Sequence, residues 1–399
     1  MDITITPTKL HGSIQAIPSK SHAHRLLICA AFANEPTDII CNLSNRDIEA
    51  TVRCLKDLGA NIKHTGFGYR VLPIEQYPQT AYLDCDESGS TLRFLLPIVG
   101  ALGIETTFIM RGVLSSRPLT PLWEEMELHG CSLARTEANE LRCTGQLLPG
   151  NYTIDGSISS QFISGLLFAM SLMNGNSQLL VNGQLVSYPY IQLTQQVLGI
   201  FGVTTHNFSV CGRRRLTSPR EVTVDGDWSN AAFYFVAQQL GNPVSIVGLD
   251  PHSPQGDREI IEFTRRMTTR CTIDVTSTPD LFPILAIMAG AYRGAEFINV
   301  RRLRYKESDR IVAVASMLKQ LGAAIIVTDD TFTVEPSVYN SCSIDSFHDH
   351  RIAMAAAIAA TIATGPVTIR NAECVAKSYP SFWDDYRKLG GIYEQHLLQ

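Results

Sequence analysis

The chain has 399 residues, 45% hydrophobic and 18% charged, so it can build a folded core and, at about 100–200 residues per domain, two or three domains. Its formal net charge of −5 gives no general electrostatic attraction to nucleic acid or to an anionic membrane. We therefore expect neither partner, and cationic sites only where they are built locally.

The N-terminal residues 1–7 alternate apolar and polar side chains, as a strand does, and lack the basic start and continuous apolar stretch of a signal peptide. The uncharged stretch 352–369 is broken by Gly365-Pro366 and is too short for a membrane helix of about 20 apolar residues, so it predicts a buried helix followed by a strand. The ten cysteines form no CxxC pair. A reducing, cytoplasmic location is the simplest interpretation.

A helix–glycine–strand pattern recurs along the chain: a helical stretch ends in an apolar residue, then Gly, then a short apolar strand. It occurs at intervals of about 70 residues, with a shorter one before Gly322, and predicts six α/β units, three in each half. The stops are Gly59, Gly130, Gly202, Gly322 and Gly390, with a glycine-less candidate at Thr269. The alternative is that the chain has no repeat, because a glycine between a helix and a strand is common in any α/β or α+β protein.

A domain junction is expected between Cys211 and Gly226, where the basic run 212–215 interrupts the apolar pattern.

Four polar segments in the first half each precede an apolar helix. They are Ser19-Lys20-Ser21 with Arg25, Ser88-Gly89-Ser90-Thr91 with Arg93, Ser115-Ser116-Arg117-Pro118, and Ser159-Ser160-Gln161. The free backbone N–H groups of a helix start favour an anion, and a nearby guanidinium can hold one in a bidentate manner. Each segment alone could be a simple helix cap, but together they predict phosphate or carboxylate binding. None is a Walker A loop.

The second half supplies acids and further cations. Charged residues alternate through 304–310, and Asp349-His350-Arg351, Lys377-Ser378 and Pro279-Asp280 each open a helical stretch. The alternatives are a solvated helix face with pairs such as Lys306–Asp309, and a simple cap at Asp280. The pairs His22/His24 and His348/His350 lack a third ligand, so no metal is expected. The residues therefore favour an enzyme for two anions with Asp and Glu as acid/base candidates.

In this order, the motifs resemble those of the EPSP synthase family of enolpyruvyl transferases. The resemblance spans nearly the whole chain and also rests on Ser187 with Pro189-Tyr190, on Gly226-Asp227 and on Lys306-Glu307-Ser308-Asp309-Arg310. It implies an α/β (α+β) fold of two domains, each with three βαβαββ repeats about a pseudo-threefold axis, and an active site in the cleft between them. The expected domains are 20–225 on the shikimate 3-phosphate side, and 1–19 with 226–399 on the phosphoenolpyruvate (PEP) side.

The resemblance implies transfer of the enolpyruvyl group of PEP to the 5-hydroxyl of shikimate 3-phosphate through a tetrahedral adduct, within aromatic amino-acid biosynthesis. It implies no cofactor and a monomer. The residues expected to bind shikimate 3-phosphate are Ser21, Arg25, Ser159, Ser160, Ser187, Asp280 and Lys306. Those expected to surround PEP are Lys20, Gly89, Arg117, Gln161, Arg310, Arg351 and Lys377.

By the same resemblance, Lys20, Asp280 and Glu307 are the expected catalytic residues. Asp280 takes the proton of the 5-hydroxyl, and Glu307 protonates the methylene carbon of PEP. Because Lys306 beside Glu307 favours the ionised acid, we expect Glu307 to gain its proton only when PEP is bound.

Four positions depart from the family pattern, namely Glu87, Tyr188, Arg302 and Pro18-Ser19, which lacks the Gly common there. Glu87 beside the Gly89 turn should weaken PEP binding unless a cation neutralises it. The resemblance implies inhibition by glyphosate, because Gly89 retains the open position on which the family's sensitivity depends.

Two other functions stay open. One is UDP-N-acetylglucosamine 1-carboxyvinyltransferase activity, although that family has Lys-Asn where Lys20-Ser21 stands and a Cys-bearing loop near Ser115–Arg117. The other is a non-catalytic anion-binding protein of the same fold, against which the acids Asp280 and Glu307 among the cations argue.

Overall fold

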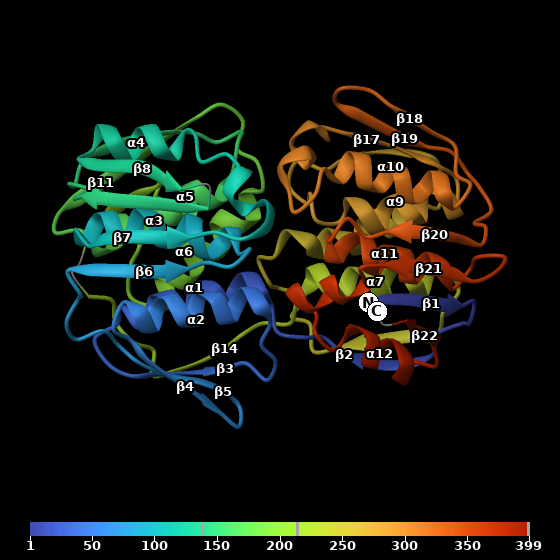
Figure 1. Cartoon of the computed structure of the whole chain (residues 1–399), viewed down its shortest axis with the longest axis horizontal. Helices are drawn as coiled ribbons and strands as arrows, with labels where there is room; N and C mark the ends of the chain where they lie inside the picture. The colour runs from blue at the N-terminus through green and yellow to red at the C-terminus, as the bar shows by residue number, and fades with distance from the viewer. Residues whose placement is uncertain (138, 213–214, 397–399) are drawn as a thin grey trace. The chain divides into compact units, whose positions relative to one another are not determined.

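The computed structural model describes residues 1–137, 139–212 and 215–396. Backbone contacts divide the chain into unit 1, Met1–Ile17 with Gly226–Gln399, and unit 2, Pro18–Asp225 (Figure 1). The expected boundaries were 19/20 and 225/226, so the first lies two residues later than the one observed. Arg213 and Arg214, part of the expected junction, lie outside the described residues.

Unit 2 contains three four-stranded sheets in its described part, each built to the same plan. Two parallel strands are followed by an antiparallel hairpin, in the orders β6-β7-β9-β8, β10-β11-β13-β12 and β14-β3-β5-β4. The strands are β3 (Thr37–Ile40), β4 (Asn61–Thr65), β5 (Gly68–Leu72), β6 (Thr80–Asp84), β7 (Glu105–Ile109), β8 (Cys131–Glu137), β9 (Glu140–Gly145), β10 (Asn151–Asp155), β11 (Asn176–Asn182), β12 (Thr205–His206), β13 (Ser209–Cys211) and β14 (Glu221–Thr223).

Helices cross between the strands of these sheets, which gives the βαβαββ repeat. The third sheet is completed by β14, which returns from the end of the unit to pair with β3. The helices are α1 (Lys20–Ala31), α2 (Arg46–Asp57), α3 (Gly89–Leu102), the 3-10 helix η1 (Gly112–Ser116), α4 (Leu122–Leu128), α5 (Ser160–Leu172) and α6 (Tyr188–Ile200).

Unit 1 repeats the plan twice, in the orders β16-β17-β19-β18 and β20-β21-β1-β22, and contains a shorter parallel pair, β15-β2. The strands are β1 (Asp2–Thr6), β2 (Gly12–Gln15), β15 (Val244–Val247), β16 (Cys271–Asp274), β17 (Ala295–Ile298), β18 (Ile325–Val327), β19 (Thr331–Val334), β20 (Cys342–Asp345), β21 (Val367–Arg370) and β22 (Ile392–His396). The helices are α7 (Trp228–Gln239), η2 (Gly256–Glu259), α8 (Ile260–Arg266), α9 (Phe282–Ala291), η3 (Arg301–Tyr305), α10 (Arg310–Gln320), α11 (His350–Ala360), η4 (Ala372–Lys377) and α12 (Phe382–Lys388).

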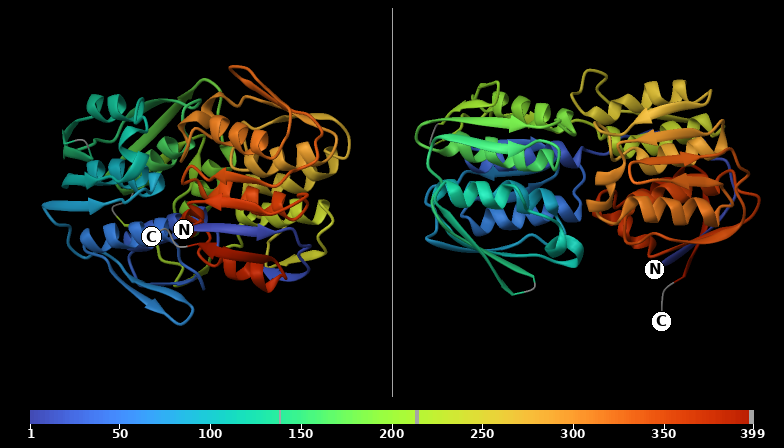
Figure 2. Two further views of the ribbon diagram at one scale, coloured as in Figure 1. Left: turned by 45° about the vertical axis from the view of Figure 1, so that its right-hand side comes forward. Right: turned by 90° about the horizontal axis from the view of Figure 1, so that it is seen from above.

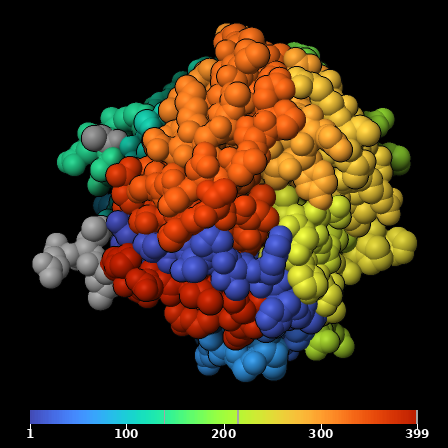
Figure 3. Space-filling view, turned by 90° about the vertical axis from the view of Figure 1, so that its right-hand side faces the viewer, coloured from blue at the N-terminus to red at the C-terminus, as the bar shows by residue number. Residues whose placement is uncertain are grey.

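The N-terminal strand β1, as the sequence predicts, is a central strand of unit 1. Ile3 pairs with Ile369 of β21 on one side and with Gln395 of β22 on the other. Figure 3 shows this N-terminal segment in blue between the red C-terminal segments. The first residues of the chain and its last strand therefore complete one sheet.

The five predicted glycine stops all lie just after a helix, with φ between +80° and +108°. Only glycine adopts such angles without strain, so these residues end the helices and let the chain turn back into a strand. The shorter interval before Gly322 also has a structural cause: after α8 the chain enters β16 directly, without the hairpin that follows Gly59, Gly130, Gly202 and Gly322. The predicted repeat and the α/β fold class are confirmed.

The core of each unit is a set of helices covered by the sheets, as Figure 2 shows. Helices α3, α5, α9 and α11 are buried on nearly every side, which their almost continuous apolar sequences explain. Gly165 lets α5 approach α3 closely, since a Cβ there would stand 2.2 Å from the carbonyl oxygen of Arg93. None of the described helices combines the length and apolarity needed to cross a bilayer.

Candidate active site

The starts of helices α1, α3 and α5 lie at one end of unit 2, because side chains of their first turns contact one another. Gln161 of α5 donates to the hydroxyl of Ser90 of α3 at 3.0 Å and accepts from Arg93 at 2.7 Å. The guanidinium of Arg25 of α1 lies 4.9 Å from the ring centroid of Phe94 of α3. Three helix N-termini with free backbone N–H groups thus face the same end of the unit.

Gly89, the first residue of α3, lies against the guanidinium of Arg117. A Cβ on Gly89 would stand 2.8 Å from Nη1 of Arg117, so no larger residue fits without moving that arginine. In the described part of the chain, the buried Nε of Arg117 has no hydrogen-bond partner and its guanidinium has no ion pair. A buried donor without a partner is costly unless a ligand satisfies it, so this corner is suited to an anion.

Arg25 is a buried cation bonded to uncharged groups. Its side chain is 2% exposed and donates to Thr194 at 2.8 Å and to the carbonyl oxygens of Ser21 and Tyr190 at 2.6 and 3.0 Å. Burial lowers its pKa to about 10, which still leaves it charged at neutral pH. Ser187 is the N-cap residue of the neighbouring helix α6, with φ +50°, and its backbone carbonyl oxygen accepts from the N–H of Tyr190. Arg25, Ser21 and Ser187 therefore form one local group.

Lys20 begins α1 and bonds through Nζ to Oδ2 of Asp47 on α2 at 2.9 Å. At the start of α5, Ser159 is the N-cap and accepts from the N–H of Gln161 at 3.3 Å, while Ser160 is buried. Ser159 therefore does act as a helix cap, yet its helix start also carries Gln161, which contacts Arg93.

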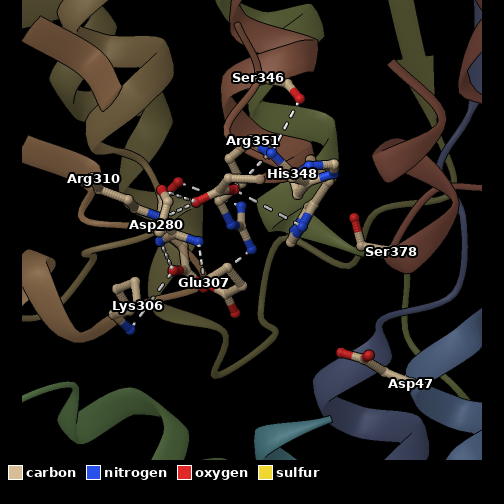
Figure 4. Close-up of polar contacts among 12 residues, drawn as sticks. Asp47, Asp280, Lys306, Glu307, Arg310, Ser346, His348, Arg351 and Ser378 are labelled. Atoms are coloured by element: carbon tan, nitrogen blue, oxygen red, sulfur yellow. Dashed lines mark hydrogen bonds and ion pairs between the residues drawn. The ribbon is translucent and has the colours of Figure 1, made fainter. Parts of the chain in front are cut away.

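In unit 1, Arg310 binds three carboxylates with its three nitrogens (Figure 4). Nη1 contacts Asp280 at 2.6 Å, Nη2 contacts Glu307 at 2.6 Å, and Nε contacts Asp349 at 2.9 Å. The Arg310 side chain is fully buried, and these carboxylates raise its pKa well above the ordinary value although burial alone would lower it. The two acid/base candidates, Asp280 and Glu307, are thereby held on the same guanidinium.

Asp280 is also surrounded by other cations. Arg351 contacts its Oδ2 at 3.0 Å, and Nζ of Lys306 lies 3.8 Å from its Oδ1. Burial would raise the pKa of Asp280, but Arg351, Lys306 and Arg310 hold it well below its usual range. Burial lowers the pKa of Lys306 from 10.5 to about 8, aided by Arg302 and Arg310 and opposed by Asp280. The carboxylate of Asp280 is therefore ionised, and the charge of Lys306 changes near neutral pH.

The segment that carries Lys306 and Glu307 is not a helix face, which corrects that alternative. Lys306 is extended after η3, and α10 begins only at Arg310, capped by Asp309 through the N–H groups of Ile311 and Val312 at 3.1 Å. Asp280 does not cap α9 either, since the N-cap is Leu281. Lys377 ends η4 and is 8% exposed. Asp280, Lys306, Glu307 and Arg310 thus form an internal charge cluster.

Two anchoring residues, Asp47 and Thr194, were missed from the sequence, and a third, Asp349, was noted there only as part of a helix opening. Asp47 holds Lys20, Thr194 holds Arg25, and Asp349 holds Arg310 and accepts from Ser308. In the sequence, Asp47 and Thr194 look like ordinary helix residues, and Asp349 looks like a helix cap. The one signal that could have suggested an ion pair is that Lys20 and Asp47 each lie at the start of a helix.

The structure also shows where three of the departures from the family pattern lie. The carboxyl carbon of Glu87 packs against Gly112, where a Cβ would be 2.9 Å away. Arg302 donates to the carbonyl oxygen of Thr276, and Tyr188 is 39% exposed. Within the described residues, no group of three His, Cys, Asp or Glu side chains is arranged to hold a metal ion.

Comparisons with known proteins identify the family of the chain. The family model described as EPSP synthase (3-phosphoshikimate 1-carboxyvinyltransferase) matches residues 5–386. Curated relatives of that name from Clostridium kluyveri and Clostridium novyi are each 38% identical and cover 98% and 99% of this chain and 98% of their own lengths.

Among solved structures, EPSP synthase from Acinetobacter baumannii is similar with a TM-score of 0.80 at 24% identity, covering 99% of this chain and 100% of its own. The enolpyruvyl transferase NikO from Streptomyces tendae reaches 0.77 at 17% identity, covering 98% of each chain. These two likenesses support the fold. With the family model matching almost the whole length, the chain belongs to the EPSP synthase (3-phosphoshikimate 1-carboxyvinyltransferase) family.

Proposed function

We propose that the protein transfers the enolpyruvyl group of PEP to the 5-hydroxyl of shikimate 3-phosphate and releases phosphate. The observation that carries this proposal, beside family membership, is that Asp280 and Glu307 share the buried guanidinium of Arg310. Addition to PEP needs a base for the hydroxyl proton and an acid for the methylene carbon, and these two carboxyl groups suit those tasks.

In the addition step, the 5-oxygen bonds to C2 of PEP, its proton passes to Asp280, and C3 takes a proton from Glu307. The tetrahedral adduct then loses phosphate from C2, which takes the proton held by Asp280, and a proton from C3, which returns to Glu307, so that the enol ether and both carboxyl groups are restored. Asp280 is a weak base while Arg351, Lys306 and Arg310 hold its pKa down. Two bound anionic substrates offset those cations, so Asp280 becomes a better proton acceptor when both are present.

Arg310 binds PEP by exchanging one of its carboxylate partners for an anionic group of the substrate. Its nitrogens are all occupied by carboxylates, and its side chain is fully buried. An anionic group of PEP that replaces Glu307 on Nη2 keeps the guanidinium paired and frees Glu307. Without its cation and beside a new negative charge, Glu307 then takes up the proton that it delivers to C3.

The residues of unit 2 supply binding groups to the same reaction. Arg117 offers an unpaired guanidinium beside the Gly89 turn, to which PEP is assigned together with Lys20 and Gln161. Arg25 lacks a carboxylate partner in the described chain, which suits it to the phosphate of shikimate 3-phosphate. Ser21, Ser159, Ser160 and Ser187, with Asp280 and Lys306 of unit 1, complete that substrate's set. Arg351 and Lys377 complete the set for PEP.

The test is phosphate release by the purified chain with shikimate 3-phosphate and PEP. We expect turnover that Glu307→Gln lowers by about 10²–10⁴-fold, because the variant cannot donate the proton. Near-normal turnover of that variant would refute the role of Glu307. Turnover with UDP-N-acetylglucosamine alone would select the related transferase, and binding of both anions without turnover would select a non-catalytic protein.

The monomeric state, the cytoplasmic location and inhibition by glyphosate stay predictions. All ten cysteines are free thiols, which is compatible with a reducing location. Light scattering on the purified chain measures the mass in solution, and adding glyphosate to the phosphate-release assay measures inhibition.

A further inference from the structure

A chain of four buried polar side chains joins α1, α2 and α3 of unit 2. Nδ1 of His24 lies 2.7 Å from the hydroxyl of Thr51, which lies 2.7 Å from the hydroxyl of Thr91, which donates to the hydroxyl of Ser88 at 2.7 Å. All four side chains are 0% exposed. Ser88 is the N-cap of α3 and also accepts from the N–H of Thr91 at 3.2 Å. The chain thus ends one residue before Gly89.

The hydrogen bonds run in one direction. A hydroxyl has one hydrogen, and Thr91 gives its hydrogen to Ser88, so Thr51 must donate to Thr91. His24 must then donate from Nδ1 to Thr51, which leaves Nε2 as the unprotonated nitrogen. Burial lowers the pKa of His24 to about 3, so the ring is neutral, and its buried Nε2 has no hydrogen-bond partner in the described chain.

The same helices also carry the contact of Lys20. Lys20 and His24 are four residues apart on α1, and their partners Asp47 and Thr51 are four residues apart on α2. Residues at this spacing share one helix face, so two contacts tie α1 to α2 side by side. Thr51 then ties α2 to Thr91 of α3. Helix α2 therefore fixes the position of Lys20 relative to the start of α3.

Capping of α3 alone does not explain why these four side chains are hydrogen-bonded in series. Ser88 caps α3 through the N–H of Thr91, and that bond needs neither Thr51 nor His24. The buried hydroxyl of Thr51 and Nδ1 of His24 are satisfied by bonds that run between helices, so their effect is to join α1 and α2 to α3.

We propose that His24, Thr51 and Thr91 are positioning residues that hold the Gly89 turn and Lys20 at the spacing required by PEP. The proposal rests on the proposed function, which assigns PEP to Lys20, Gly89 and Arg117. None of the three residues is a catalytic residue.

Thr51→Val tests the role, because valine keeps the shape but leaves the His24 N–H without an acceptor and Thr91 without a donor. We expect KM for PEP to rise about tenfold, while kcat and KM for shikimate 3-phosphate change less than about threefold. Thr91→Val should act in the same direction, and Thr51→Ser should restore the wild-type KM. The double variant Thr51→Val/Thr91→Val should have the same KM for PEP as Thr51→Val, since both substitutions interrupt the same series of hydrogen bonds.

Thr106→Val is the matched control. Thr106 is also 0% exposed, lies in β7 of the same unit, and donates only to the carbonyl oxygen of Ile104 at 3.0 Å. Its variant should lower the melting temperature while leaving KM for PEP unchanged. Equal KM values for Thr51→Val and Thr106→Val in an active enzyme would overturn the positioning role without touching the proposed function.

A second measurement does not depend on turnover. Nitrogen-15 NMR of the histidines should show His24 as the neutral tautomer protonated on Nδ1 from pH 5 to pH 8. A ring protonated on Nε2, or one that titrates in this range, would contradict the hydrogen-bond direction. No turnover in the wild-type chain would instead refute the proposed function.

Discussion

The buried arginines of this molecule differ in whether they have carboxylate partners. Arg117 and Arg25 have no carboxylate partner in the described chain, whereas Arg310 has three. An unpaired buried cation is held ready for an anion, and a fully paired one can accept an anion only by exchange. Arg117 and Arg25 of unit 2 can therefore bind an anion directly, whereas Arg310 of unit 1 must first give up a carboxylate.

Gly89→Ala should raise KM for PEP by about tenfold with a smaller effect on shikimate 3-phosphate, since the added Cβ would stand 2.8 Å from Nη1 of Arg117 and must displace it. Steady-state kinetics with each substrate varied in turn measures the two constants. Gly150→Ala is the control, because its Cβ would meet nothing within 4 Å. If Gly89→Ala raises both KM values equally, Arg117 does not belong to PEP alone.

Lys306 should set a pH limit on activity. Its pKa is lowered to about 8, so the ammonium that we propose holds shikimate 3-phosphate is present below that pH and is lost as the pH rises through it. We therefore expect kcat/KM for shikimate 3-phosphate to fall above about pH 8. Lys306→Arg, which stays charged, should remove this fall even if its activity at pH 7 is lower. A profile that rises through pH 8 would instead make neutral Lys306 the active form.

At the scale of the element, glycine decides where helices end. Gly202 follows α6 with φ +80°, whereas Gly199 lies inside the same helix with open space at its Cβ position. Alanine at the first position should destabilise the protein by about 1 kcal/mol, and alanine at the second should stabilise it by about 0.5–1 kcal/mol. Thermal unfolding of both variants measures the difference, and two shifts of the same sign would contradict this account of the helix end.

The predictability of these elements has a physical boundary. Helix stops such as Gly59 and starts such as Ser88 were readable because they depend on a few neighbouring residues. The cluster on Arg310 was not readable from spacing, because Asp280 and Asp349 lie 30 and 39 residues away along the chain and meet only when α9, α10 and α11 pack. The family resemblance named Asp280 and Arg310 as site residues but not their ion pair.

At the scale of the whole molecule, β1 is the connection on which unit 1 depends. Thr4→Pro should destabilise unit 1 by on the order of 3 kcal/mol, since β1 is hydrogen-bonded on both edges and proline cannot donate. Limited proteolysis should then cut within 226–396 before 18–225. Thr8→Pro, outside the strand, is the control, and equal protection of both variants would contradict this role of β1.

The position of β1 also bears on how the protein emerges from the ribosome. Residues 18–225 are continuous and can fold while synthesis proceeds, whereas β1 must wait until β21 and β22, including the stretch near residue 396, have left the exit tunnel. Strand β1 is therefore made before residues 18–225 but finds its place in a sheet after them. Until β21 and β22 emerge, β1 stays unpaired with its two apolar side chains, Ile3 and Ile5, uncovered, which makes it a natural binding target for chaperones.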